Sequence, residues 1–392
     1  MTYLDHAATS PPTREVLEAV WPYLVQVTAN PASVHTPGQQ AREGLERARA
    51  SAAAAIGCRP GEVVFTSGGT EADGLAVLGV APALAAARGR ERHLVTTAVE
   101  HSAVLEPARE LERRGWRVDV VGVDGAGRVD VGALATAVTA QTALVSVMHA
   151  NNEVGTVQPV AAVSRLCAER GVALHVDAVQ SAGVLDLREL WALGSATGGV
   201  AAVSVSAHKL GGLRGSGLLA VRSGTPLEPL AIGGGQERGR RSGTVDVASA
   251  VGLATALSVA AARREREVVR LAGLRDRLVA GVLAAGAAAG VEVALTGAPL
   301  GAGRLPGHAS FVLPGLSGEV VLAELDLAGV ACSSGSACAA DSDDASHVLV
   351  AMGLSADDAR SAVRCTLGWS SAEADVDALL DALPTALSRS RL

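Results

Sequence analysis

The sequence predicts an α/β protein with two domains: a large one built on a mostly parallel seven-stranded sheet flanked by helices, and a smaller α+β domain. The chain has 392 residues, of which 49% are apolar, enough to fill one large core and a smaller one. Short β-rich runs alternate with helical stretches between about residues 60 and 222, as in parallel sheets. After residue 245 the sequence changes to a long stretch rich in Ala and Arg. We therefore predict residues 15–255 as the large domain, and residues 1–14 with 256–392 as the small one.

Seven apolar runs in the large domain have the length and composition of buried strands. In chain order they cover residues 62–66, 93–97, 117–121, 144–148, 172–177, 200–206 and 217–221. Helical stretches lie between several of them, at residues 71–87, 102–114 and 159–170. The first strand stops at Ser67-Gly68-Gly69-Thr70, and this turn leads directly into helix 71–87.

The small domain is predicted from a change in composition and in the length of the elements. A helix over 245–289 is followed by shorter strands and helices around Phe311, Val320, Val348 and Leu379. Residues 297–307, rich in Gly and Pro, indicate a loop between them. The chain shows no repeat of fixed period.

Composition and charge exclude several classes of function. The formal net charge is −7, so the chain offers no basic surface for nucleic acid, and we expect no nucleic-acid partner. The first residues lack a basic segment followed by an apolar run, so we expect no signal peptide and a mature chain that begins near Met1. The uncharged stretches 278–291 and 131–152 are too short or too polar to predict a membrane span.

The cysteines favour a reducing compartment. There are five, without a C-x-x-C pair, which makes a poor disulfide framework and a poor zinc site: Cys58, Cys167, Cys332, Cys338 and Cys365. We therefore expect a cytoplasmic protein and no bound metal.

Lys209 is the only lysine among 33 basic residues. Arginine can replace lysine as a charge, but it cannot lose its proton and form an imine with an aldehyde. A single retained lysine is thus a candidate for covalent chemistry, with chance survival on the surface as the alternative.

Polar residues follow five of the predicted strands. They are Ser67-Gly68-Gly69-Thr70, Glu100-His101, the segment 149–153, Asp177 to Gln180, and Ser206-Ala207-His208-Lys209. Ligands of open α/β sheets bind at the carboxyl ends of the strands, so these groups are expected to converge at one edge.

These groups suit pyridoxal phosphate. Free N–H groups where Gly69 and Thr70 open a helix favour a phosphate. Lys209 can bind the aldehyde, and Asp177 can pair with the pyridinium nitrogen and keep the ring an electron sink. His101 is the candidate for stacking on the ring, because aromatic residues make up only 2% of the chain. Taken singly, the glycine turn is weak evidence, and His101 and Asp177 are also typical helix caps.

Nine motifs, in order along nearly the whole chain, resemble those of the cysteine desulfurases. These enzymes belong to the class-V aminotransferase superfamily, with the fold-type-I pyridoxal phosphate architecture. The motifs are LDHAAT (4–9), NPASVH (30–35), FTSGGTEAD (65–73), EHSAV (100–104), HANNEVG (149–155), HVDAVQSAG (175–183), SAHK (206–209), RRSGT (240–244) and SSGSAC (333–338).

The resemblance implies a role for each matching residue. Lys209 holds the cofactor, Asp177 pairs its ring nitrogen, His101 stacks on the ring and shuttles protons, and Gln180 bonds the ring phenolate. The phosphate is held by Gly69, Thr70, Ser206 and His208, with Thr244 reaching in from a second subunit, which implies a homodimer. Asn152 and Arg364 hold the substrate on its carboxylate side, and an arginine fork suits a carboxylate.

Cys338 matches the nucleophile of the family. Its neighbours are Ser, Gly, Ala and Asp, a composition that predicts an exposed loop, whereas Cys58, Cys167 and Cys365 suit a core position better. Cys332 is expected to be structural. By resemblance, Lys209 takes the α-proton of L-cysteine, and Cys338 attacks the substrate sulfur. Alanine is released, and the Cys338 persulfide passes its sulfur to an acceptor protein, as in iron–sulfur cluster assembly or other sulfuration.

Three departures from the family pattern are Gly74 in place of Asn, Leu213 within a Gly-Gly-Leu-Arg segment, and Trp369 in place of Arg. No position with an implied catalytic role is lost. Two alternatives stay open: a selenocysteine lyase or general C–S lyase on the same scaffold, and a sulfur-relay scaffold without cofactor chemistry.

Overall fold

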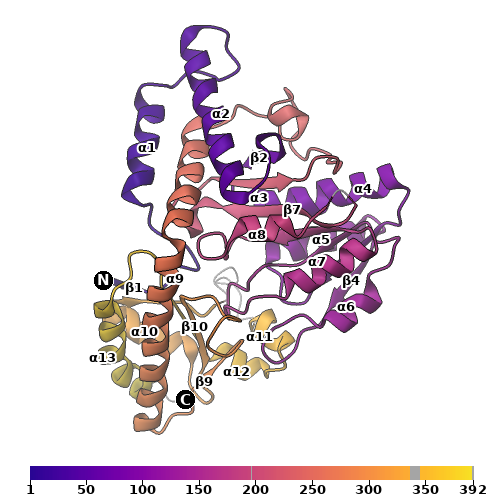
Figure 1. Ribbon diagram of the computed structural model, residues 1–392. Coiled ribbons are helices and arrows are strands. Elements are labelled where there is room, and N and C mark those ends of the chain that lie inside the picture. The colour runs from indigo at the N-terminus through magenta and orange to yellow at the C-terminus, as the bar shows by residue number, and fades with distance from the viewer. Residues whose placement is uncertain (196, 336–344, 391–392) are drawn as a thin grey trace.

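The computed structural model describes residues 1–195, 197–335 and 345–390. Its centre is a seven-stranded sheet in the order β2-β8-β7-β6-β5-β3-β4 (Figure 1). The strands are β2 (Val63–Thr66), β3 (His93–Thr97), β4 (Arg117–Val121), β5 (Leu144–Ser146), β6 (Ala173–Asp177), β7 (Gly199–Ser206) and β8 (Gly217–Val221). All neighbours are parallel except β8, which is antiparallel to β2 and β7. The predicted mostly parallel sheet is confirmed.

Helices cover both faces of this sheet. Alternate strand residues face opposite ways, so that Val95, Val145 and Leu174 join one core, while Leu94 and Leu144 join another. The first core is closed by α1 (Arg14–Val25), α2 (Thr36–Ile56), α6 (Val131–Ala137), α7 (Val160–Glu169), α8 (Leu187–Ala192) and the first part of α9 (Val247–Ala289). The opposite face is closed by α3 (Gly69–Gly74), the π-helical η2 (Leu75–Val80), α4 (Ala81–Arg88) and α5 (Ser102–Arg113).

Several boundaries differ from those predicted by one or two residues, among them those of one helix and one strand. The helix expected over 71–87 begins at Gly69 and runs through a π-helical turn to Arg88. The strand expected over 144–148 ends at Ser146. Beyond it, Val147 and His149 still donate to carbonyls of β6, but the backbone N–H of Met148 donates to a side chain, the carboxylate of Glu100 (2.9 Å). Sequence periodicity does not reveal such a switch in hydrogen-bond partner.

The small domain is built around two short sheets. β9 (Ala294–Leu295), β10 (His308–Val312) and β12 (Ala362–Thr366) form one, and β1 (Thr2–Tyr3) pairs with β11 (Val330–Ala331) in the other. The helices are α10 (Gly318–Leu327), α11 (His347–Ala351), α12 (Ala356–Arg360) and α13 (Glu373–Arg389). The four landmarks expected there fall in β10, α10, α11 and α13, and the predicted loop lies between β9 and β10.

The helix α9 connects the two cores. Its 43 residues run unbroken along the side of the molecule (Figure 1). Buried residues up to Leu257 pack in the core of the large sheet, and those from Leu271 onward pack with the small domain. The predicted boundary near residue 255 thus falls within one helix, and the domain limits stay a prediction.

One helical run of the described chain, Gly69–Arg88, is long and apolar enough to cross a membrane by length and composition alone. About two-thirds of it is buried inside the protein, where it packs against the central sheet. Core helices of this kind pass the same test.

Candidate active site

A cavity of about 310 Å³ lies at the carboxyl ends of the central strands. It is lined by ten of the twelve residues predicted for the site: Gly69, Thr70, His101, Asn152, Asp177, Gln180, Ser206, His208, Lys209 and Arg364. Nine of them belong to the large domain, and Arg364 comes from β12 of the small one. The expected convergence at one sheet edge is therefore seen in the structure.

The two other predicted residues are not placed at this cavity. Thr244 is exposed and does not line it within one chain. Cys338 lies outside the described residues. Gly335, three positions earlier in the sequence, does line the cavity.

One end of the cavity is shaped for close approach of an anion. A Cβ atom added to Gly69 would lie 2.8 Å from Cγ2 of Val179, so only glycine fits here. Gly69 begins a helical run, whose first N–H groups have no partners within the helix. The hydroxyl of Ser206 is buried and has no hydrogen-bond partner in the described protein. Backbone donors and an unpaired hydroxyl suit a phosphate group.

Asp177 ends strand β6 at the floor of the cavity. Its carboxylate accepts a hydrogen bond from the N–H of Val179 at 2.8 Å. Burial raises the pKa of Asp177, while the Val179 hydrogen bond and the charges of His101 and Lys209 oppose the rise. A pyridinium nitrogen beside this carboxylate would favour its charged form.

Two further buried carboxyl groups lie near Asp177, and the sequence analysis assigned neither of them a role in the site. Asp73 lines the cavity, and Glu100 immediately precedes His101. Burial, and next the charge of Asp177, raise the pKa of Asp73 well above its ordinary value. The signal for Asp73 was present in the sequence, because it lies four residues after Gly69 and therefore on the same helix face.

A buried histidine completes this group. His175 contacts Ser146 and Ser204 through its two ring nitrogens, at 2.9 and 2.8 Å, and its Nε2 lies 3.5 Å from Asp73. Burial lowers the pKa of His175 to about 3, so the ring is neutral at physiological pH. A neutral His175 forms no ion pair with Asp73, and Asp177 is the residue of this group placed to balance a positive ring.

Lys209 is held by the N-terminal segment. Its Nζ donates to the carbonyls of Ala7 and Ala8, each at 2.7 Å, and Gln180 Nε2 donates to Ala7 at 3.0 Å. The LDHAAT motif thus supplies the acceptors that aim the amine along the cavity wall.

His101 caps helix α5, and this contact fixes its tautomer. Nδ1 accepts a hydrogen bond from the N–H of Ala103 at 3.1 Å, so the proton of the neutral ring is on Nε2. His101 therefore caps helix α5 and also lines the cofactor cavity, so the two roles considered for it in the sequence do not exclude each other.

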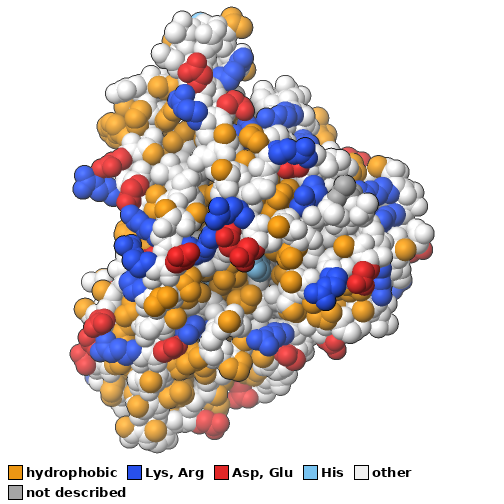
Figure 2. Space-filling model, viewed as in Figure 1, with side chains coloured by type: hydrophobic (Ala, Val, Ile, Leu, Met, Phe, Trp, Pro, Cys, Tyr) orange, Lys and Arg blue, Asp and Glu red, His pale blue; other side chains and the backbone are white. Residues whose placement is uncertain are grey.

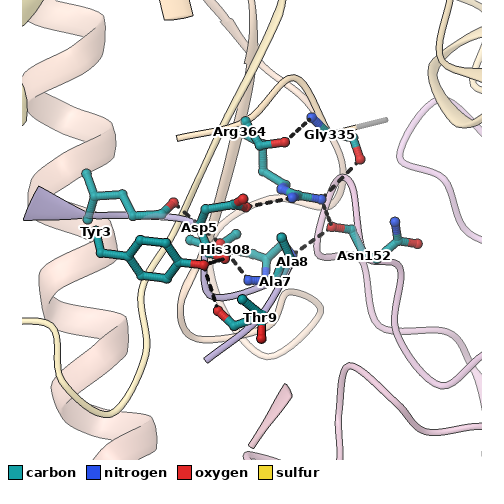
Figure 3. A network of polar contacts seen from close by, with 12 residues as sticks. Tyr3, Asp5, Ala7, Ala8, Thr9, Asn152, His308, Gly335 and Arg364 are labelled. Atoms are coloured by element: carbon teal, nitrogen blue, oxygen red, sulfur yellow. Dashed lines mark hydrogen bonds and ion pairs between the residues drawn. The ribbon is translucent and has the colours of Figure 1, made fainter. Parts of the chain in front are cut away.

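Arg364 joins three segments across the cavity (Figure 3). Its Nη1 donates to the carbonyls of Asn152 (2.9 Å) and Gly335 (3.1 Å), and its Nη2 donates to Asp5 Oδ1 (2.8 Å). The Nε donor is buried and has no partner within the described residues. An unpaired guanidinium donor at the cavity suits a carboxylate ligand.

Two of the departures noted in the sequence contact each other. Gly211 has a positive φ of 83°, and a Cβ there would lie 3.3 Å from the indole nitrogen of Trp369. That nitrogen donates to the carbonyl of Pro11 at 3.0 Å. Trp369 lines a second cavity, of about 110 Å³, on the other side of Lys209. The Gly-Gly-Leu-Arg segment and Trp369 therefore form one packing unit beside the site.

The side chains fit pyridoxal phosphate. The glycine cradle and the unpaired Ser206 hydroxyl match its phosphate, Asp177 its ring nitrogen and Lys209 its aldehyde. The described residues do not offer a comparable site for a metal ion, because no three His, Cys, Asp or Glu side chains among them gather closely enough to bind one.

Replacing Glu100 with Gln should change the pH dependence of stability. Burial, outweighing hydrogen bonds from Thr97 and Met148, raises the pKa of Glu100 to about 8. The folded state therefore keeps a proton that the unfolded state loses above pH 4.5, so stability falls as pH rises toward 8, by a few kcal/mol on the order of magnitude. Gln cannot ionise but can accept both hydrogen bonds. Urea unfolding of the apoprotein at pH 5 and pH 8 should show a smaller loss for Glu100→Gln.

Glu62→Gln is the matched control. Although burial raises the pKa of Glu62, hydrogen bonds from Arg59 and Ser223 lower it to about 2. Its stabilising contribution is complete above pH 4.5 and is lost only as pH falls toward 2. This variant should lose stability about equally at pH 5 and pH 8. Equal pH slopes for Glu100→Gln and the unmodified protein would contradict the assignment.

Comparison with known proteins gives one consistent result. The family model of class-V aminotransferases matches residues 2–379. An IscS-like cysteine desulfurase of Mycobacterium tuberculosis is 47% identical over 397 aligned positions, covering 100% of this chain and 97% of that protein. The cysteine desulfurase IscS of Dictyoglomus turgidum is 39% identical, covering 99% and 95%. A solved NifS-like protein superposes with a TM-score of 0.88 at 34% identity, covering 99% of both chains.

Proposed function

Because the chain belongs to the class-V aminotransferase family and is a pyridoxal-phosphate-dependent cysteine desulfurase, we propose how its own residues convert L-cysteine to L-alanine. The observation that carries the proposal is the single cavity that holds Lys209, Asp177 and Arg364 together. When bound, pyridoxal phosphate supplies an aldehyde for Lys209 and a ring that accepts electrons from the substrate.

Residues that line the cavity bind and orient the cofactor and the substrate. Gly69, Thr70, Ser206 and His208 hold the phosphate, Gln180 bonds the ring hydroxyl, and His101 lies against the ring. Arg364 offers its unpaired Nε to the substrate carboxylate, while Asp5 and the carbonyl of Asn152 hold its Nη atoms in place.

Proton movements fall to Lys209 and His101. Carbonyls of Ala7 and Ala8 hold Nζ of Lys209 in position, and this amine takes the α-proton of cysteine. Nδ1 of His101 accepts from Ala103, which leaves Nε2 to carry a ring proton and return it as alanine forms. Asp177 balances the charge of the ring nitrogen, while His175 stays neutral behind it.

Sulfur leaves through Cys338. We propose that its thiolate attacks the substrate sulfur and keeps it as a persulfide, which passes to an acceptor protein for iron–sulfur cluster assembly or another sulfuration. Support comes from the family match and from Gly335, just upstream in the sequence, which lines the cavity and accepts from Arg364.

Cys338→Ala tests this proposal directly. With L-cysteine and a reductant, the unmodified enzyme should give alanine and sulfide in equal amounts, and the variant should lose both by at least about 10³-fold. Cys58→Ser is the matched control, because burial raises the pKa of the Cys58 thiol to about 12 and leaves it unreactive. Pyruvate in place of alanine, or activity retained by Cys338→Ala, would instead support a C–S lyase.

We further propose a homodimer in which Thr244 reaches the cofactor phosphate of the other subunit. Exposed apolar side chains follow one face of α1 at helical spacing: Leu17, Trp21, Leu24 and Val25. In Figure 2, hydrophobic side chains gather at the upper left, over this helix. An apolar stripe of this kind is typical of an interface between subunits.

Trp21→Glu should convert the dimer to monomers. Trp21 is 61% exposed in the single chain, and a carboxylate there would be buried without a partner in the dimer. Sedimentation equilibrium should show the mass of one chain, with cofactor affinity lowered by loss of Thr244. Leu327→Glu, at an 81% exposed site on α10, should leave the mass unchanged. A Trp21→Glu protein that stays dimeric would exclude this face.

The compartment is proposed to be the cytoplasm. Free thiols are kept reduced there, and the described residues include four free cysteines, at positions 58, 167, 332 and 365.

A further inference from the structure

Cys332 and Cys365 face each other across an antiparallel strand pair. Ser333 and Arg364 exchange both backbone hydrogen bonds, N–H to carbonyl, at 3.1 and 2.6 Å. The next pair along such a ladder is Cys332 opposite Cys365, in the non-hydrogen-bonded register. Opposite Cα atoms in that register lie about 4.5 Å apart, within the range of roughly 4.4–6.8 Å that a disulfide requires.

Both thiols point away from the cavity. Strand residues alternate between faces, so Arg364 lines the cofactor cavity while Cys365 packs in the core of the small domain. Cys332 packs against the same core but is partly exposed. Interaction with the Cys332 thiol is the largest cause of the raised pKa of Cys365. The two thiols form a pair with one accessible member and one buried member.

The pair is separate from the desulfurase chemistry proposed above. The sequence analysis expected Cys332 to be structural and Cys365 to fill the core, and the proposed mechanism uses neither. In contrast, Cys167 is buried in the large core, and no thiol partner of it is found among the described residues.

We propose that Cys332 and Cys365 form a second thiol site, which takes sulfane sulfur from a persulfide or polysulfide and releases it as hydrogen sulfide. This activity goes beyond the conversion of cysteine and does not require Cys338. Its product on the protein is a Cys332–Cys365 disulfide.

The two steps balance in atoms and electrons. First, the Cys332 thiolate attacks the outer sulfur of a persulfide R–S–SH; the S–S bond breaks, R–S⁻ leaves and takes a proton, and Cys332 becomes a persulfide. Next, the Cys365 thiolate attacks the inner sulfur of that persulfide, and hydrosulfide leaves and is protonated to hydrogen sulfide. Two thiols are oxidised to a disulfide, and one sulfane sulfur is reduced to sulfide.

The setting of Cys365 makes the second step slow. Interaction with the nearby Cys332 thiol and burial raise the pKa of the Cys365 thiol well above the ordinary value, so little thiolate is present at neutral pH. The site therefore acts when sulfane sulfur persists, as when the acceptor is lacking, and competes little with rapid transfer. An external dithiol returns the pair to the reduced form.

The test uses the full-length Cys338→Ala protein treated with sodium tetrasulfide without oxygen. Four of the five cysteines remain, and we expect two to be lost to thiol titration in denaturant, with about one equivalent of sulfide released per chain on disulfide closure. Cleavage at arginine gives fragment 305–360, which holds Cys332, and fragment 365–389, which begins at Cys365. Without a reductant these fragments should be joined, lighter by two hydrogen atoms, and a reductant should separate them.

Single variants in the same background identify the two roles. Cys332→Ser should abolish both the uptake of sulfur and the cross-link. Cys365→Ala should leave a stable extra sulfur on fragment 305–360 with no cross-link. Cys167→Ala should behave like its parent.

Four untouched thiols, a persulfide that stays on Cys332 when Cys365 is intact, or a cross-link through Cys58 or Cys167 would each overturn the proposal. Because Cys338 is absent throughout, these outcomes do not depend on whether the proposed desulfurase mechanism holds.

Discussion

Lys209→Arg should yield no alanine from L-cysteine, with a loss on the order of 10⁴-fold. Arginine keeps the positive charge and can donate to the carbonyls of Ala7 and Ala8, which now accept from Nζ of Lys209 at 2.7 Å. Its guanidinium stays protonated, however, so it can neither bind an aldehyde covalently nor take a proton from substrate. The fold should be unaffected, as judged by thermal unfolding.

Borohydride reduction provides a readout that is independent of turnover. Lys209 is the only lysine of the chain, so reduction of the cofactor-loaded protein should fix one pyridoxyl group, on the peptide that contains residue 209. The arginine variant should bind the cofactor reversibly and retain no label. Lys209→Ala with added methylamine should recover part of the activity, because a small amine can enter the vacated space. A labelled Lys209→Arg protein would show that the cofactor binds elsewhere.

Arg364→Lys should lower kcat/KM for L-cysteine by about 10²-fold, mainly through KM. Lysine provides a point charge but not the fork that bonds Asp5, Asn152 and Gly335 while leaving Nε for the substrate. A loss of that size corresponds to about 2.8 kcal/mol. Steady-state kinetics that follow alanine, together with the dissociation constant of a non-reactive carboxylate analogue, separate binding from chemistry.

Arg304→Lys is the matched control for Arg364→Lys. Arg304 is also a buried arginine, bonded to the carbonyls of Val154, Thr296 and Ala298, but it does not line the cofactor cavity. The Arg304→Lys variant should have a lower free energy of unfolding and a KM that is nearly unchanged. If both variants raise KM equally, the effect of Arg364 is structural, and its role with the substrate carboxylate fails.

The sequence predicted the sheet and the edge at which polar groups meet, because short apolar runs and the residues that follow them are local features. Lys209 was identifiable from composition alone. Arg364 was not, since it reaches the cavity from a strand more than 150 residues away, and only the family resemblance indicated it. The same limit applies to Thr244, whose proposed partner lies in another chain.

Other features depend on burial, which one sequence does not reveal. Glu100 was expected only as one of the polar residues at the sheet edge, yet the structure encloses it completely and raises its pKa to about 8. The pairing of Cys332 with Cys365 follows from the register of two short segments whose sequences contain no strand signal strong enough to align them.

The continuity of α9 has a mechanical consequence. The helix is about 65 Å long and contains no proline, so it acts as a stiff lever that spans both cores. Turning one half of it by a single degree displaces its tip by about 0.6 Å. Misplacement of reacting groups by about 1 Å costs on the order of 100-fold in rate. A turn of about two degrees would therefore move the tip of α9 by about 1 Å, so the stiffness of a helix that does not line the cofactor cavity helps to keep the two cores in register.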